Sequence, residues 1–328
     1  MSLRSCYLGL IGAALVASVM SGPASAQKKL RWAHVYEVTE PFHTEALWAA
    51  AEIRKRSNGR FAIEVFPASQ LGNESQLSDA LGSGSIDIVY VGINFAATTY
   101  RPLGITGAPF MLRDFEHWKA YRASSLFAEL AKGYEDKTGH KIVALTYYGQ
   151  RHVTARKPIH VPEDMNGMKL RVPPAPLVLM FTKSVGATAI PIAFSDVYTA
   201  LQQGLVDGQE NPLPTIMAKK FYEVQSHVVL TGHITESMVT VIGRHVWAKL
   251  TPDDRKLFTD TLKEAAGEAT ESIEASERIL AGQLKKLGMT VIEPDREAFR
   301  NAAIPLHNDA SVGAGWTREQ YDELQALK

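Results

Sequence analysis

Two apolar patterns alternate in the first part of the chain. Short apolar runs of strand length are separated by amphipathic runs of helix length, and the third short run is nearly continuous, as in a strand buried in a parallel sheet. Pro41 suits a first helical turn, and Asn73 is a favoured helix cap. The order β-α-β-α-β predicts an open α/β sheet with right-handed crossovers, so the ends of the first and third strands share one rim. The predicted strands are 30–35, 61–66 and 86–91, and the predicted helices are 39–59 and 73–81.

A second strand-and-helix set is predicted farther along the chain. Met168–Val172 alternates like a strand, with Asn166-Gly167 as the turn before it and two prolines after it. Arg171 therefore lies at the carboxyl end of a strand, where ligands of open α/β sheets collect. Its planar guanidinium can hold a carboxylate with two hydrogen bonds. The sequence thus favours an anion site at this rim, and polar loop ends at 194–196 and 206–212 are predicted to face the same crevice.

The remaining patterns predict that the chain passes between two α/β domains more than once. A helix of over thirty residues, from Thr251 to Leu287, is long enough to span both domains, with a possible kink at Gly267. The predicted boundaries are 27–148 plus about 237–276 for domain I, and 149–236 plus about 277–328 for domain II. The other predicted elements are a helix at 114–133, strands at 140–148, 226–230, 238–242 and 289–292, and a helix at 317–327.

The first 26 residues have the three parts of a signal peptide. Arg4 gives a positive start, 7–20 is apolar, and Ala24-Ser25-Ala26 is a small-residue cleavage site, so cleavage is expected after Ala26. The only cysteine, Cys6, lies within this segment. The mature chain therefore has no thiol for disulfides, metal ligation or nucleophilic catalysis.

Composition and motifs argue against several classes of function. Thirty-five basic residues balance 35 acidic residues, whereas nucleic-acid binding and polybasic membrane anchoring usually require a basic surplus. Sequence patterns for phosphate loops, zinc proteases and hydrolase elbows are missing. Ser195 and Asp196 have no histidine at a predictable distance, and the histidines have no metal-ligand spacing. We therefore expect a binding protein without a cofactor or metal, rather than an enzyme.

Four motifs, GMKLRVP, PIAFSDVYTALQQG, VDGQENP and KKFYEVQ, occur in this order between Gly167 and Gln225. In these motifs the chain resembles the DctP-like substrate-binding proteins of tripartite ATP-independent periplasmic (TRAP) transporters, and the resemblance extends from about Leu30 to the C-terminal helix. It implies a two-lobed, type II-like periplasmic binding protein fold, with a multi-strand hinge and a long spanning helix. It also implies a periplasmic monomer that delivers a small carboxylate to two TRAP membrane subunits. A ligand-sensing role is the alternative.

The resemblance also implies site residues. Arg171 would clamp the substrate carboxylate, Asn211 and Arg151 would lie in the same site, and Phe194 would pack on the ligand. From the predicted rim we add residues at strand ends and at positions where sialic-acid binders carry other side chains. These are His34, Tyr36, Glu37, Asn94, Phe95, Tyr148 and Pro174.

The chain departs from the sialic-acid-binding pattern at several of these positions. Gly92 and Phe95 stand where a glutamate and an arginine are expected, and Pro174 and Tyr148 replace asparagines. Aromatic side chains thus replace polar contacts. The predicted ligand is a small aromatic or hydroxyaromatic monocarboxylate. The alternative is a hexuronate or other sugar acid, whose hydroxyls Glu37, Asn94 and Gln150 could bind.

Overall fold

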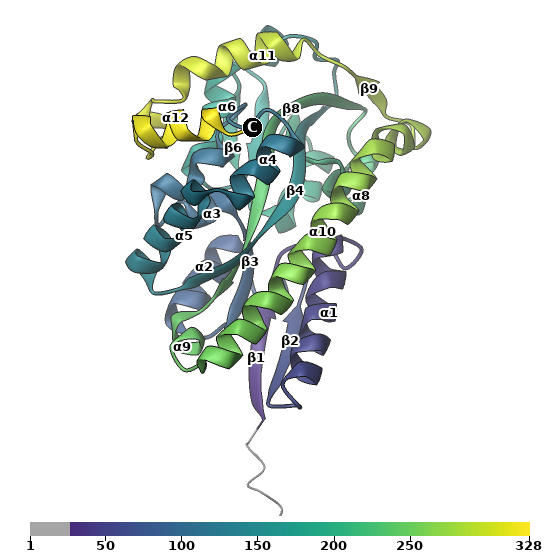
Figure 1. Cartoon of the computed structure of the whole chain (residues 1–328). Coiled ribbons are helices and arrows are strands. Elements are labelled where there is room, and N and C mark those ends of the chain that lie inside the picture. The colour runs from purple at the N-terminus through teal and green to yellow at the C-terminus, as the bar shows by residue number, and fades with distance from the viewer. Residues whose placement is uncertain (1–26) are drawn as a thin grey trace, which may run out of the picture.

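The computed structural model describes residues 27–328, so the predicted signal peptide lies outside the described residues. Its centre is a single nine-stranded mixed sheet in the order β2-β1-β3-β8-β4-β7-β5-β6, with β9 beside β8 (Figure 1). The strands are β1 Lys28–Ala33, β2 Phe61–Phe66, β3 Ile88–Gly92, β4 Lys141–Ala155, β5 Lys169–Val172, β6 Thr188–Pro191, β7 Gly208–Pro212, β8 His227–Ile242 and β9 Thr290–Ile292.

Helices flank this sheet, and their starts follow ordinary capping chemistry. At α2, the Asn73 side chain accepts from the Gln76 amide at 3.0 Å, and the Gln76 side chain accepts from the Asn73 amide at 2.9 Å. The helices are α1 Pro41–Arg56, α2 Glu74–Ser83, α3 Ile93–Ala96, α4 Phe115–Ala123, α5 Ser125–Thr138, α6 Leu179–Ser184, α7 Val197–Gln202, α8 Leu213–Ala218, α9 Arg244–Trp247, α10 Pro252–Lys286, α11 Arg296–Ala303 and α12 Arg318–Ala326.

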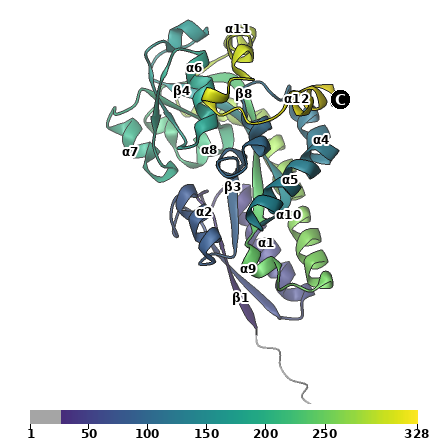
Figure 2. The ribbon, with the colours of Figure 1, turned by 90° about the vertical axis from the view of Figure 1, so that its left-hand side faces the viewer.

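Two long antiparallel strands join the halves of the sheet. β4 and β8 pair from Lys141 opposite Ile242 to Ala155 opposite His227. At one end β8 pairs with β3, and at the other β4 pairs with β7. Figure 2 shows β1, β3 and α2 in the lower lobe and α6, α7 and α11 in the upper lobe. The predicted two-lobed α/β fold with a multi-strand hinge is confirmed, while the residue boundaries of the two domains stay a prediction.

The long strands differ from the predicted elements. We expected separate strands at 226–230 and 238–242, but β8 is continuous, because Gly232 takes a left-handed φ of +51° and donates its N–H to His152 Nδ1 at 3.0 Å. β4 likewise continues past Tyr148, with irregular pairing around Gly149 and Arg151. Within the predicted loop 206–212, residues Gly208–Pro212 form the buried strand β7.

The helices bring two further corrections. The predicted helix 114–133 is two helices, because the Ser124 side chain caps a new helix by accepting from the Phe127 amide at 3.2 Å. α10 is one continuous helix of 35 residues that passes through Gly267, and the kink there stays a prediction. It runs diagonally past both lobes in Figure 1. Within residues 27–328, none of the helices combines the length and apolar character needed to cross a membrane.

Candidate functional site

A small enclosed cavity lies where the two lobes meet. Its walls come from the ends of β1, β3 and β5, from β7, and from the crossing strands β4 and β8. The free volume is only about 20 Å³, roughly one water molecule, so an organic acid can enter only if the lobes part or side chains shift. The lining residues are Tyr36, Glu74, Gly92, Asn94, Phe95, Tyr148, Arg151, Arg171, Pro173, Phe194, Asn211 and Glu236.

Arg171, at the end of β5, is a buried cation with no acidic partner among the described residues. Its side chain is 1% exposed. Nε and Nη2 both donate to the carbonyl oxygen of Ile192, at 2.9 and 2.7 Å. Burial lowers the pKa of Arg171 to about 10, which leaves the guanidinium charged at neutral pH. An anion at this place would offset the cost of keeping the charge out of water.

Arg151, on β4, has a different environment, because two carboxylates surround it. Nε and Nη2 pair with Glu210, and Nη1 lies 2.7 Å from Glu236 Oε2. Burial alone would lower the pKa of Arg151, but the charges of Glu210 and Glu236 raise it well above its usual value. His233 Nε2 lies 3.2 Å from Glu210, completing a buried network. The charge of Arg151 is therefore already neutralised within the protein.

Asn211 belongs to the same network. Its Oδ1 accepts from Arg151 Nη2 at 3.4 Å, and its Nδ2 donates to Gln209 Oε1. Both ends of the amide are therefore engaged by the protein, which makes Asn211 a positioning residue for Arg151 in this arrangement.

An aromatic wall covers one side of the cavity. The ring centroid of Tyr36 lies 5.2 Å from that of Tyr148 in an edge-on arrangement and 6.4 Å from that of Phe194. The Tyr36 hydroxyl is buried and has no hydrogen-bond partner among the described residues. Burial raises the pKa of Tyr36 well above its ordinary value, so the hydroxyl keeps its proton and can donate it to a ligand.

Asn94 also lines the cavity, and its Oδ1 lies close to Gly107. Asn94 Nδ2 donates to Glu236 Oε1 at 3.2 Å, while Asn94 Oδ1 is buried and without a partner within residues 27–328. A free acceptor of this kind suits a hydroxyl group. Phe95, the next residue of α3, is also buried and lines the cavity.

Glu74 lines the cavity but is not among the site residues predicted from the sequence. It is the first residue of α2, directly after the cap Asn73, so the sequence did place a carboxyl at a helix start. Burial raises the pKa of Glu74 to about 7, although the positive charges of Arg171 and Arg151 oppose the shift. Near neutral pH a large share of Glu74 is therefore protonated and able to donate a hydrogen bond. Glu236 and Pro173 were missed as well.

Three predicted site residues do not line the cavity. His34 lies inside the first lobe against His43 Nδ1, at 3.3 Å, where burial lowers its pKa to about 3. Glu37 lies at the rim and pairs with Lys219 Nζ at 2.7 Å. Pro174 is exposed, because the side chains after β5 alternate in direction and Pro173 takes the inner position.

A second contact between the lobes lies beside the aromatic wall. Thr215 of α8 donates to the buried Glu40 Oε1 at 2.6 Å and lies 3.4 Å from the Tyr148 hydroxyl. Glu40 precedes α1 in the first lobe, so this hydrogen bond forms between lobes. Burial raises the pKa of Glu40 to about 7.

Residues 27–328 contain no cluster of three or more His, Cys, Asp or Glu side chains arranged for a metal ion. The cavity holds a buried guanidinium, that of Arg171, without an acidic partner among the described residues. Such a group can attract a small anion.

Known proteins resemble this chain along most of its length. Residues 32–312 match the model of bacterial extracellular solute-binding protein family 7. The sialic acid-binding periplasmic protein SiaP of Vibrio cholerae is 32% identical over 273 residues, which are 83% of this chain and 85% of that protein.

Two solved structures have the same fold. A TRAP periplasmic solute-binding protein of Polaromonas sp. JS666, bound to D-erythronate, superposes with a TM-score of 0.87 at 31% identity, covering 92% of this chain and 99% of that one. A second such protein, from Roseobacter denitrificans with bound L-galactonate, superposes with a TM-score of 0.84 at 30% identity. The match covers 91% of this chain and 98% of that one. The chain therefore belongs to family 7 of the bacterial extracellular solute-binding proteins, the periplasmic substrate-binding components of TRAP transporters, and is not an enzyme.

Proposed function

We propose that this protein captures a short-chain hydroxy acid of the sugar-acid class in the cavity between its lobes and delivers it to the membrane subunits of a TRAP transporter. The observation that carries the proposal is the buried Arg171 guanidinium, which has no acidic partner among residues 27–328. A ligand carboxylate supplies the missing charge, and water exclusion on closure strengthens the pairing.

The free polar atoms around Arg171 support a ligand with hydroxyl groups. Asn94 Oδ1 accepts from one hydroxyl, and the Tyr36 hydroxyl and protonated Glu74 donate to others. The acids bound by the relatives, namely sialic acid, D-erythronate and L-galactonate, belong to this class.

In this proposal the two arginines have different roles. Arg171 binds the ligand carboxylate, whereas Arg151, held by Glu210 and Glu236, positions the cavity wall. Phe194 and Tyr148 pack against the carbon skeleton, because aromatic faces also stack on the C–H faces of polyhydroxylated chains. The protein acts as a monomer that closes over one ligand.

A small aromatic or hydroxyaromatic acid is the second candidate ligand. It is favoured by the four buried rings of Tyr36, Phe95, Tyr148 and Phe194 on the cavity wall. A flat ring could lie between Phe194 and Tyr148 with its carboxylate on Arg171.

A thermal-shift screen separates the two ligand classes. Binding to the folded state stabilises it by about 2.7 kcal/mol at a hundredfold excess over Kd. The screen compares D-erythronate, L-galactonate and glucuronate with benzoate and 4-hydroxybenzoate. We expect the sugar acids to raise the melting temperature. A response to the aromatic acids alone would overturn the first candidate in favour of the second.

A further inference from the structure

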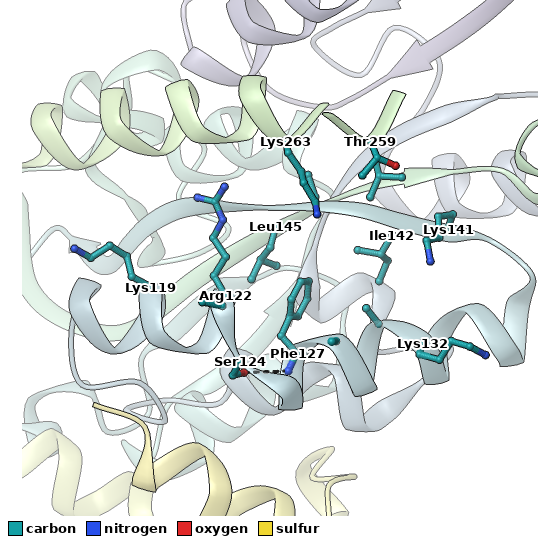
Figure 3. Close-up of a pocket in the computed structure, with 15 residues that line it drawn as sticks. Lys119, Arg122, Ser124, Phe127, Lys132, Lys141, Ile142, Leu145, Thr259 and Lys263 are labelled. Atoms are coloured by element: carbon teal, nitrogen blue, oxygen red, sulfur yellow. Dashed lines mark hydrogen bonds between the residues drawn. The ribbon is translucent and has the colours of Figure 1, made fainter. Parts of the chain in front are cut away.

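A larger groove lies on another face of the molecule, between α4, α5 and α10 and above the first part of β4 (Figure 3). Its volume of about 610 Å³ falls in the range of small-molecule sites. None of its lining residues takes part in the cavity between the lobes. It is therefore a separate candidate site.

The polar lining of this groove is positively charged. Five cationic side chains line it, and its lining includes no aspartate or glutamate. The five are Lys119, Arg122, Lys132, Lys141 and Lys263.

Three of these cations are paired with acids just outside the groove. Lys119 pairs with Glu116 and Lys141 with Glu135, each at 2.7 Å, and Lys132 pairs with Asp136. Such surface pairs are weak and leave the lysines able to interact with a further anion.

Arg122 and Lys263 have no salt-bridge partner in the part of the chain that the structure describes. They come from α4 and α10, on opposite sides of the groove, and Figure 3 shows both extending toward the β4 segment that carries Leu145. The Arg122 guanidinium lies 5.7 Å from the ring centroid of Trp118, which fixes its position. Partial burial also lowers the pKa of Arg122, because no carboxylate offsets the loss of water.

The floor of the groove is apolar. Ile142 and Leu145 of β4 form its base, and the ring of Phe127 rises from α5 between the two rims (Figure 3). Phe127 is only partly buried, so an apolar ligand would cover surface that now faces water. An apolar floor between unneutralised cations matches a molecule with one acid group and an apolar body.

We propose that this groove binds an amphiphilic organic anion, with its acid group between Arg122 and Lys263 and its apolar body on Ile142, Leu145 and Phe127. The chemical class is a carboxylate with an alkyl chain of medium length, distinct from the hydroxy acids of the interlobe cavity. The proposal is independent of the proposed transport ligand, since the two sites share no residue.

The test uses three matched probes: octanoate has both the charge and the chain, acetate has the charge alone, and 1-octanol has the chain alone. Titrations followed by amide chemical shifts are made on the full mature chain carrying Arg171→Ala, which removes the cation of the interlobe cavity. We expect octanoate to shift the amides of Phe127 and Leu145, with acetate and 1-octanol at least tenfold weaker.

Two variants locate the acid group. Lys263 is exposed on α10, so Lys263→Gln leaves the fold intact, and Arg122→Gln tests the opposite rim. Each should weaken octanoate binding at least fivefold, whereas Lys137→Gln, an exposed cation of α5 outside the groove, should not. Equal affinity in Lys263→Gln and the control would overturn the proposal, and so would shifts confined to the interlobe cavity. Binding only of vesicles that contain anionic lipid, with no response to free octanoate, would also overturn it.

Discussion

Arg171 gives two of its hydrogen bonds, from Nε and Nη2, to a single acceptor, the carbonyl oxygen of Ile192, at 2.9 and 2.7 Å. This neutral acceptor fixes the plane of the guanidinium but leaves its charge uncompensated. Arg151, a neighbour in the same cavity, is paired with two carboxylates. The folded protein therefore supplies carboxylate partners to Arg151 but none to Arg171. We expect Arg151 to matter for stability and Arg171 for ligand binding.

The first prediction concerns stability. Arg151→Ala leaves Glu210 and Glu236 buried without their cation, so we expect it to lower the free energy of unfolding by about 3–5 kcal/mol. Arg171→Ala removes a buried charge that has no acidic partner, so the unfolding free energy of the ligand-free protein should change little. Urea unfolding of both variants measures the two values. An unfolding free energy of Arg151→Ala equal to that of the wild type would contradict the stabilising role of the Arg151, Glu210 and Glu236 network.

The second prediction concerns pH. Glu40 is buried against Thr215 of the other lobe, and burial raises its pKa to about 7 from an ordinary value of 4.5. If opening exposes Glu40 to water, its pKa falls back to about 4.5 in the open protein. At a pH between 4.5 and 7, closure of the lobes is then accompanied by protonation of Glu40. Binding that requires closure is then favoured below about pH 4.5 and loses this contribution as the pH rises through 7.

We therefore expect ligand affinity to fall by about thirtyfold between pH 5.5 and pH 8, where a ligand carboxylate stays ionised. Glu37 and Lys219 also face Glu40, and Glu74 has a similarly raised pKa, so the decisive measurement is a comparison of variants. Glu40→Gln should flatten the profile measured by calorimetry. Superimposable profiles for the variant and the wild type would exclude Glu40 as the titrating group.

The third prediction concerns the rim of the cavity. The Glu37–Lys219 ion pair links the two lobes at 2.7 Å, and Lys219 Nζ lies 5.1 Å from the ring centroid of Phe194. Since the pair is partly exposed, Lys219→Ala should weaken binding by only about 0.2–1 kcal/mol, mainly through faster ligand release.

Salt dependence distinguishes this ion pair from a packing effect. The difference between Lys219→Ala and the wild type should shrink in 1 M salt, where the Debye length is about 3 Å. Lys249→Ala, which removes an exposed lysine far along the chain from either residue, serves as the control in stopped-flow measurements of release. A loss of affinity in Lys219→Ala that is the same at low and high salt would contradict the electrostatic account.

Much of the fold could be predicted from local sequence. Short apolar runs predicted β1, β2 and β3, the third of them nearly continuous, and caps such as Asn73 and Thr251 predicted the starts of α2 and α10. The helical pattern from Thr251 to Leu287 predicted the long helix. These features follow from periodicity and capping, which involve residues close together in the chain, whereas the two-lobed fold was implied by the family resemblance.

The elements that were predicted wrongly depend on contacts between residues far apart in the sequence. β8 stays continuous across Gly232 because its amide meets His152, which lies 80 positions away in the sequence. β7 forms because its polar residues are buried against β4, where Glu210 meets Arg151. A loop-like composition cannot reveal such pairing, since tertiary contacts override local propensity.

The candidate site was predictable to a similar extent. Arg171, Asn94 and Phe194 were identified from strand ends and motifs, and they line the cavity. Glu74 was missed because a carboxyl in the first turn of a helix is usually explained by the helix dipole alone. The two arginines looked alike in sequence, and only their partners in space distinguish them.

The most direct test of the central claim is calorimetric titration of the wild type and Arg171→Ala with the acid that gives the largest thermal shift. Lys169→Ala, an exposed cation on the same strand, is the matched control. We predict that Arg171→Ala loses about 2–5 kcal/mol of binding free energy and that the control binds as the wild type does. Near-normal affinity in a folded Arg171→Ala protein would contradict the assignment of Arg171 as the residue that holds the ligand carboxylate.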